Sequence, residues 1–135
     1  MADFNTQVIE EFRANEGRVG GMFEGAPMIL LTHTGRKSGN AHTTPLVYTR
    51  DGDDYVVIAS KAGADTHPVW YLNLQANPRV RVEVGTETFD ADARIIEAGE
   101  ERDRLYNAQA ELMPNFKEYE QKTDRVIPVV VLSRV

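Results

Sequence analysis

The order of strand and helix signals along the chain constrains the fold most. Three strand-like segments, at residues 28–34, 43–50 and 55–60, follow one another with only short turns between them. The pair Asp51-Gly52 between the second and third segments is typical of a β-hairpin. The chain lacks the regular alternation of strands and helices that a doubly wound parallel sheet requires. The sequence therefore predicts an antiparallel, mainly β fold with flanking helices.

The remaining segments complete this prediction. Residues 79–84 alternate with period two, residues 86–96 alternate less cleanly, and residues 127–132 are so apolar that they indicate a strand buried on both faces. Helical patterns lie at residues 3–16, 68–76, 100–113 and 115–122. We expect about six strands and three or four helices, arranged as a small antiparallel barrel with helices at its mouth.

Length and composition limit the class of protein. The 135 residues suit a single domain, 1–135, in which residues 1–25 form the N-terminal helix and a glycine-rich connection. The chain has no cysteine, which excludes disulfides and thiolate metal sites. The histidines do not have metal-ligand spacing, so no metal site is expected. The acidic N-terminus does not resemble a signal peptide, and we expect a cytoplasmic protein.

The distribution of charge indicates a discrete anionic ligand. The net charge is −6, which argues against general binding of nucleic acid. Residues 33–50 nevertheless contain Arg36, Lys37 and Arg50 and no acid. Within this stretch, residues 35–39 (GRKSG) combine glycines, two cations and a hydroxyl, as anion-binding turns do. A plain solvated hairpin turn has the same composition, so both interpretations stay open.

Two further segments could carry chemistry. Residues 59–71 form a small-residue loop with one lysine, Lys61, followed by a helix start, and such loops bind phosphates or carbonyls. The alternative is an ordinary strand–loop–helix connection in which Trp70, the single tryptophan, anchors the core. Residues 113–119 carry Phe116 and Tyr119 three apart, which could line the mouth of a pocket or simply pack inward.

Taken together, these segments resemble a known family. The motifs GRKSG, ASKAG, HPVWYLNLQANP and TDRVIPVVVL occur in one order and spacing, and the likeness to the deazaflavin-dependent nitroreductase family covers nearly the whole chain. The resemblance implies a split β-barrel of the FMN-binding type. It also implies that coenzyme F-420, a deazaflavin with a phosphate and several carboxylates, is bound near the turn at residues 35–39.

The resemblance also implies which residues form the site. The matched positions for the coenzyme are Arg36, Lys37, Ser38, Gly39, His42, Pro45, Ile58, Ala59, Ser60, Lys61, Ala62, Gly63, Val69 and Trp70. Ser60 and Tyr119 are the candidates for hydrogen bonding or proton donation to the acceptor. His42 stands where many relatives carry arginine. Met113 and Phe116 stand where nitroreductase members can carry tyrosine, which leaves nitroimidazole reduction open.

Three functions are compatible with this pattern. The first is an F-420H2-dependent reductase that transfers a hydride to a quinone, a nitro compound or a conjugated carbonyl. The second is an FMN-dependent reductase on the same barrel, and the third is a non-catalytic carrier of F-420. A small-molecule electron acceptor is the expected partner, with no nucleic acid and no stable membrane insertion. The natural acceptor, a transient contact with the inner face of the membrane, and the choice between monomer and homodimer stay open.

Overall fold

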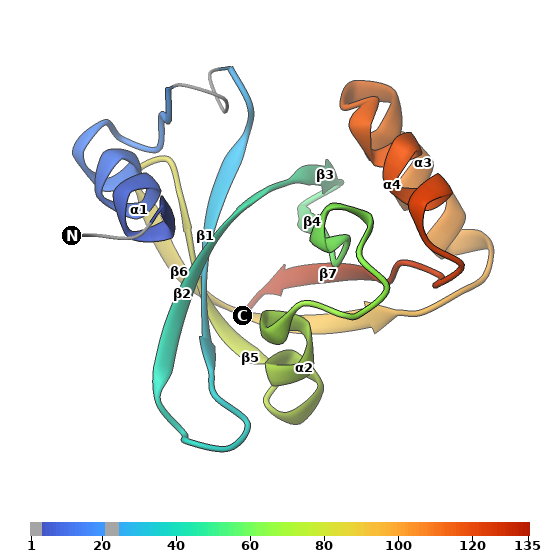
Figure 1. The fold of residues 1–135 in the computed structure, drawn as a ribbon. Coiled ribbons are helices and arrows are strands. Elements are labelled where there is room, and N and C mark those ends of the chain that lie inside the picture. The colour runs from blue at the N-terminus through green and yellow to red at the C-terminus, as the bar shows by residue number, and fades with distance from the viewer. Residues whose placement is uncertain (1–3, 21–24) are drawn as a thin grey trace.

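The fold is a strongly curved antiparallel sheet with helices at its ends and edges (Figure 1). The computed structural model describes residues 4–20 and 25–135. The strands are β1 (Met28–Thr34), β2 (Ala41–Val47), β3 (Thr49–Asp51), β4 (Asp54–Ile58), β5 (Arg79–Val84), β6 (Glu87–Ile96) and β7 (Val129–Arg134). The helices are α1 (Phe4–Ala14), α2 (Val69–Ala76), α3 (Glu100–Leu112) and α4 (Asn115–Lys122), with a single 3-10 turn, η2 (Lys61–Gly63). The mainly β architecture predicted from the sequence is confirmed.

The sheet closes on itself through one continuous stretch of chain. Its strand order is β2-β1-β5-β6-β7-β4-β3, and all neighbouring strands are antiparallel. The two edge strands, β2 and β3, are separated only by Tyr48, whose amide donates to the carbonyl of Pro27 at 3.1 Å. The sequence predicted one strand over residues 43–50, whereas the structure bends this stretch at Tyr48. That bend lets the same stretch pair with β1 at one end and with β4 at the other.

The core has two layers that share the central strands. On β7, Val130 and Leu132 face the cluster inside the barrel, while Val129 and Val131 face the cluster beneath α3 and α4. This alternation explains the uninterrupted apolar run of that segment, because both faces of the strand are covered. The expected strand at 127–132 is therefore confirmed, with its start moved to Val129 by the preceding Pro128. A third cluster joins Val8 and Phe12 of α1 to β1.

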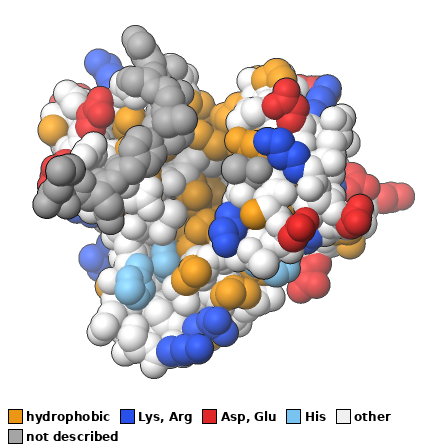
Figure 2. All heavy atoms as spheres, in the orientation of Figure 1, with side chains coloured by type: hydrophobic (Ala, Val, Ile, Leu, Met, Phe, Trp, Pro, Cys, Tyr) orange, Lys and Arg blue, Asp and Glu red, His pale blue; other side chains and the backbone are white. Residues whose placement is uncertain are grey.

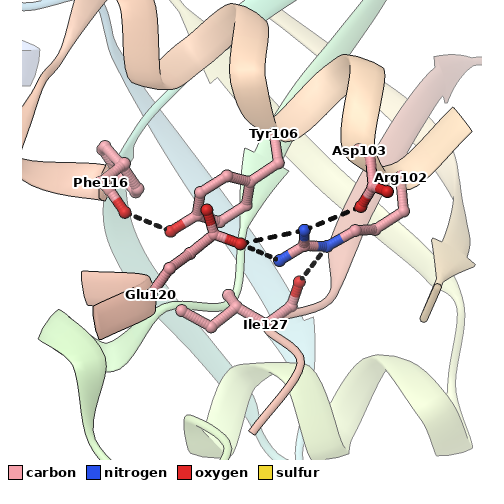
Figure 3. Close-up of polar contacts among 6 residues, drawn as sticks. All are labelled: Arg102, Asp103, Tyr106, Phe116, Glu120 and Ile127. Atoms are coloured by element: carbon pink, nitrogen blue, oxygen red, sulfur yellow. Dashed lines mark hydrogen bonds and ion pairs between the residues drawn. The ribbon is translucent and has the colours of Figure 1, made fainter. Parts of the chain in front are cut away.

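Helices α3 and α4 are fastened to each other by a buried arginine (Figure 3). The side chain of Arg102 is 6% exposed, and its Nε donates to the carbonyl of Ile127 at 2.9 Å. Both of its Nη atoms donate to Oε2 of Glu120 on α4 at 3.1 Å, and Nη1 also donates to Asp103 at 3.0 Å. The hydroxyl of Tyr106 donates to the carbonyl of Phe116, so a second bond joins the two helices. These contacts position α4 beside the loop that follows β4.

Candidate active site

The turn between β1 and β2 presents one arginine and one lysine side chain to solvent. The amide of Gly35 donates to the carbonyl of Asn40 at 2.8 Å, and the amide of Gly39 donates back to the carbonyl of Gly35 at 2.9 Å. Gly39 has a φ of 73°, a conformation that a residue with a Cβ adopts only under strain. The closed turn therefore holds Arg36 and Lys37 in exposed positions.

A depression of about 230 Å³ lies beside this turn. It is lined by Gly35, Arg36, Lys37, Ser38, His42, Val69 and Asn73. Arg36 and Lys37 make no ion pair with any carboxylate in residues 4–20 and 25–135, whereas Arg13, Arg79, Arg94 and Arg134 each do. Figure 2 shows the molecule hollowed between the α1 side and the α4 side, with hydrophobic atoms inside and Lys and Arg atoms over the β1–β2 turn. The unpaired cations are therefore available to an anionic ligand.

Asn73 fastens the turn to helix α2. Its side chain is 3% exposed, Oδ1 accepts from the amide of Arg36 at 3.0 Å, and Nδ2 donates to Nδ1 of His33 at 2.9 Å. Because Nδ1 accepts, the proton of the neutral imidazole is on Nε2, which donates to Thr44 at 3.0 Å. Asn73 is not among the candidate residues derived from the sequence. Its position between two leucines in the mostly apolar helix VWYLNLQA is the signal that could have found it, because a buried amide needs partners.

The buried His33 predicts a pH dependence of stability. Burial, with a smaller contribution from His42, lowers the pKa of His33 to about 4. A lowered pKa in the folded state means that His33 favours folding above its unfolded pKa of about 6.5, and that this contribution is lost as the pH falls toward 4. We expect urea midpoints between pH 7 and 4 to fall more steeply in the native protein than in His33→Gln. Parallel pH profiles for the two proteins would contradict this.

The loop after β4 forms the second part of the candidate site. Ile58, Ala59 and Ser60 are buried at the end of the strand. Ser60 is right-handed helical, with φ −78° and ψ −39°, and Lys61 follows with a φ of 48°. Turns of this kind direct successive backbone amides toward one side and form concavities for anions. The ammonium of Lys61 donates to Oγ1 of Thr66 at 3.1 Å, which holds it over the loop.

Helix α4 packs directly on this loop and carries Tyr119. A Cβ at Gly63 would lie 3.0 Å from the carbonyl oxygen of Tyr119 and 3.0 Å from Cβ of Lys122. The hydroxyl oxygen of Tyr119 accepts from Nδ2 of Asn115 at 2.8 Å, which leaves its own O–H free to donate. Its ring packs edge-on against Phe116. Tyr119 can therefore act as a hydrogen-bond donor at the edge of the loop.

The structure brings the predicted site residues together in two groups. One group lines the depression at the β1–β2 turn, and the other forms the loop beneath α4. The loop continues through Pro68 into Val69, which is 66% exposed and lines the depression, so the two groups are joined in the chain. Pro45 lies on edge strand β2, opposite Leu30, where a residue without an N–H is tolerated. Trp70 packs in the barrel core and is 6% exposed. The roles of all these residues toward a coenzyme stay predictions.

The chain is similar over nearly its whole length to one known family. A model of the F-420H2-dependent quinone reductase family matches residues 5–134. The chain belongs to this family. An F-420H2-dependent quinone reductase of Mycobacterium tuberculosis is 42% identical over 126 residues, which cover 91% of this chain and 85% of that protein. The deazaflavin-dependent reductase class expected from the motifs is confirmed by this family assignment.

Solved structures agree with the family and the fold. The structure of an F-420H2-dependent reductase, FDR-A, has 41% identity and a TM-score of 0.73, and the match covers 79% of this chain and 94% of that chain. A protein described as a domain-swapped dimer has 38% identity and a TM-score of 0.75, covering 95% and 93%. HutZ, the heme storage protein from Vibrio cholerae, shares the fold at 19% identity and a TM-score of 0.64, covering 94% and 87%. The split β-barrel predicted from the sequence is thus confirmed.

Within residues 4–20 and 25–135, no group of three or more His, Asp or Glu side chains is arranged to hold a metal ion. Among the helices of the same described residues, none is both long and apolar enough to span a bilayer.

Proposed function

We propose that this chain is an F-420H2-dependent reductase that transfers a hydride to a quinone or to a related nitro or conjugated-carbonyl acceptor. The observation that carries the proposal is the depression at the β1–β2 turn, where Arg36 and Lys37 have no carboxylate partner among the described residues. Family membership and the M. tuberculosis relative, which is named an F-420H2-dependent quinone reductase, support the same activity.

The residues present fit the chemistry of the coenzyme. A phosphate and several carboxylates need cations and N–H donors, and this chain offers Arg36, Lys37 and Lys61 together with the amides of the loop after β4. The turn is rigidly held through Asn73, so little ordering is required when an anion binds. His42 stacks on His33 with 5.9 Å between ring centroids and lines the same depression. We assign the phosphate and the acidic tail to this region.

In this reaction the chain would position the coenzyme and the acceptor, donate a proton or hydrogen bonds, and exclude water from the reacting atoms. The reduced deazaflavin supplies the hydride when it is bound, so no nucleophile or metal of the protein is required. Ser60 and Tyr119 would donate hydrogen bonds to the acceptor oxygen as negative charge develops on it. The hydrophobic atoms inside the hollow would exclude water from the reacting atoms (Figure 2).

Titration of the protein with oxidised F-420, followed by fluorescence, tests the proposal. Lys37→Ala is expected to raise the Kd about tenfold, because a charge-assisted bond to the anion is lost. High salt should weaken binding by the native protein and weaken binding by Lys37→Ala less. Arg94→Ala is the matched control, since it removes one cation that is paired with Glu101 away from the depression. No binding of F-420 by the native protein would overturn the proposal.

The contribution of Tyr119 is tested separately. Tyr119→Phe keeps the ring against Phe116 and removes the hydroxyl that Asn115 orients. We expect kcat with menadione to fall about tenfold or more, while the Kd for F-420 changes less than twofold. Unchanged turnover would remove Tyr119 from the mechanism.

The alternatives predict different signals. An FMN-dependent reductase would carry a flavin with a long-wavelength absorption band, which a deazaflavin lacks. A carrier would bind F-420H2 tightly and leave menadione unreduced. The relative described as a domain-swapped dimer supports a homodimer, which light scattering would detect. We also propose that the protein is cytoplasmic and makes a transient contact with the membrane when its acceptor is a membrane quinone.

A further inference from the structure

We propose that Arg125 is a positioning residue that sets the shape of the coenzyme-binding loop, residues 59–67, without touching the coenzyme itself. This inference rests on the proposed function, because it concerns the loop assigned to the coenzyme. Arg125 lies in the segment between α4 and β7 and belongs to none of the candidate positions derived from the sequence.

The donors of Arg125 are fully used within the protein. Its guanidinium has five N–H groups, and the structure gives five hydrogen bonds for them. The acceptors are the carbonyls of Ala59, Ser60 and Ala64, with Ala64 accepting two bonds, and Nδ1 of His67, at distances of 2.9–3.1 Å. A ligand could not gain a bond from Arg125 without breaking one of these. Arg125 therefore acts through the loop.

These bonds determine where the loop amides point. The C=O and N–H of a trans peptide point in opposite directions, and the structure has no cis peptide among the described residues. Because the carbonyls of residues 59, 60 and 64 face Arg125, the amides of Ser60, Lys61 and Asp65 face away from it. One side of the loop thus presents acceptors to an internal cation, and the other side presents N–H groups to an anion.

The same segment holds the loop at a second point. The hydroxyl of Thr123 donates to Oδ1 of Asp65 at 2.7 Å and accepts from the amide of Arg125 at 3.1 Å. Lys61 keeps a positive φ of 48° within this frame, a conformation that a non-glycine residue holds only when its surroundings enforce it. Four carbonyl-directed bonds from one guanidinium provide that enforcement.

Lysine cannot replace the guanidinium. An ammonium has three N–H donors in a compact group, whereas the acceptors here are spread over Ala59, Ser60, Ala64 and His67. In Arg125→Lys the charge stays and the geometry is lost. We expect the loop amides to become mobile and the Kd for F-420 to rise about tenfold or more, with kcat at saturating F-420H2 changing less than threefold.

The experiment combines two measurements on Arg125→Lys. Hydrogen exchange of the amides of residues 60–67 is measured without ligand, and F-420 affinity is measured by fluorescence. The matched control is Arg134→Lys, which changes an exposed arginine on β7 that pairs with Glu87. Faster exchange confined to the loop, together with weaker F-420 binding, is the expected result.

Each outcome has a separate meaning. Exchange in the loop that is unchanged in Arg125→Lys would overturn the positioning role, whether or not F-420 binds. Faster exchange with unchanged affinity would overturn it as well. Failure of the native protein to bind F-420 would instead contradict the proposed function, while the exchange measurement would still decide whether Arg125 orders the loop. A fall in thermal stability alone, with exchange raised evenly over the whole chain, would mean a merely structural role and would also overturn the inference.

Discussion

Replacing Arg102 by methionine is expected to lower the free energy of unfolding by about 2–3 kcal/mol. The substitution keeps much of the aliphatic volume and removes the guanidinium that lies between α3 and α4 (Figure 3). The carbonyl of Ile127, a residue that is 0% exposed, would lose its donor, and an unsatisfied buried carbonyl is costly. Glu120 would lose its cation, but this carboxylate is 39% exposed and water compensates in part, so the expected loss is smaller than for a fully buried pair.

Urea unfolding of Arg102→Met measures this effect, and Arg104→Met is the matched control. Arg104 is on the same helix, two residues further along, and pairs with Asp51 at 3.1 Å with 57% of its side chain exposed. An exposed pair of this kind contributes little, so the control should shift the unfolding midpoint only slightly. Equal shifts in the two variants would mean that burial of Arg102 has no special importance.

Replacing Gly63 by alanine is expected to impair both stability and coenzyme binding. Gly63 has a φ of 82°, and a Cβ there would be 3.0 Å from the carbonyl of Tyr119 and the side chain of Lys122. We expect a loss of about 1–3 kcal/mol, because backbone strain and displacement of α4 add together. Since Gly63 belongs to the proposed coenzyme-binding loop, we also expect the Kd for F-420 to rise, and since α4 carries Tyr119, we expect kcat to fall.

Gly52→Ala separates the two causes of this loss. Gly52 also has a positive φ, 60°, but no described atom lies within 4 Å of the Cβ that alanine would add. This control therefore contains the backbone strain without the displacement of α4. If Gly52→Ala lowered the urea midpoint and the coenzyme affinity as much as Gly63→Ala, the packing of α4 on the loop would not matter for the site.

We expect stability and function to be coupled in this protein through α4. Arg102 binds this helix through Glu120, which directly follows Tyr119, and Gly63 packs against the carbonyl oxygen of Tyr119 itself. Loss of either contact should therefore move Tyr119. Turnover of Arg102→Met at temperatures where it stays folded would show this coupling as a fall in kcat.

The sequence by itself determined the positions of most helices and strands and the class of ligand to expect. Period-two alternation at residues 79–84 placed β5 at its observed bounds, and residues 115–122 were predicted as the helix that α4 forms. The apolar run before the C-terminus identified a strand covered on both faces, because only such a strand tolerates consecutive valines. The cations of the GRKSG turn indicated an anionic ligand, since no acid lies near them in the chain.

The tertiary structure decided which distant residues hold the loops of the candidate site. Asn73 binds the β1–β2 turn over a separation of 37 residues, and Arg125 binds the loop after β4 over separations of 58–66 residues. Their partners are mostly backbone atoms. Every residue type has a backbone carbonyl, so the sequence does not show which carbonyl accepts a hydrogen bond. Periodicity reports which face of an element is buried, because burial depends on the side chain itself. The direction of a loop carbonyl depends on the folded chain around it, and only the fold determined it.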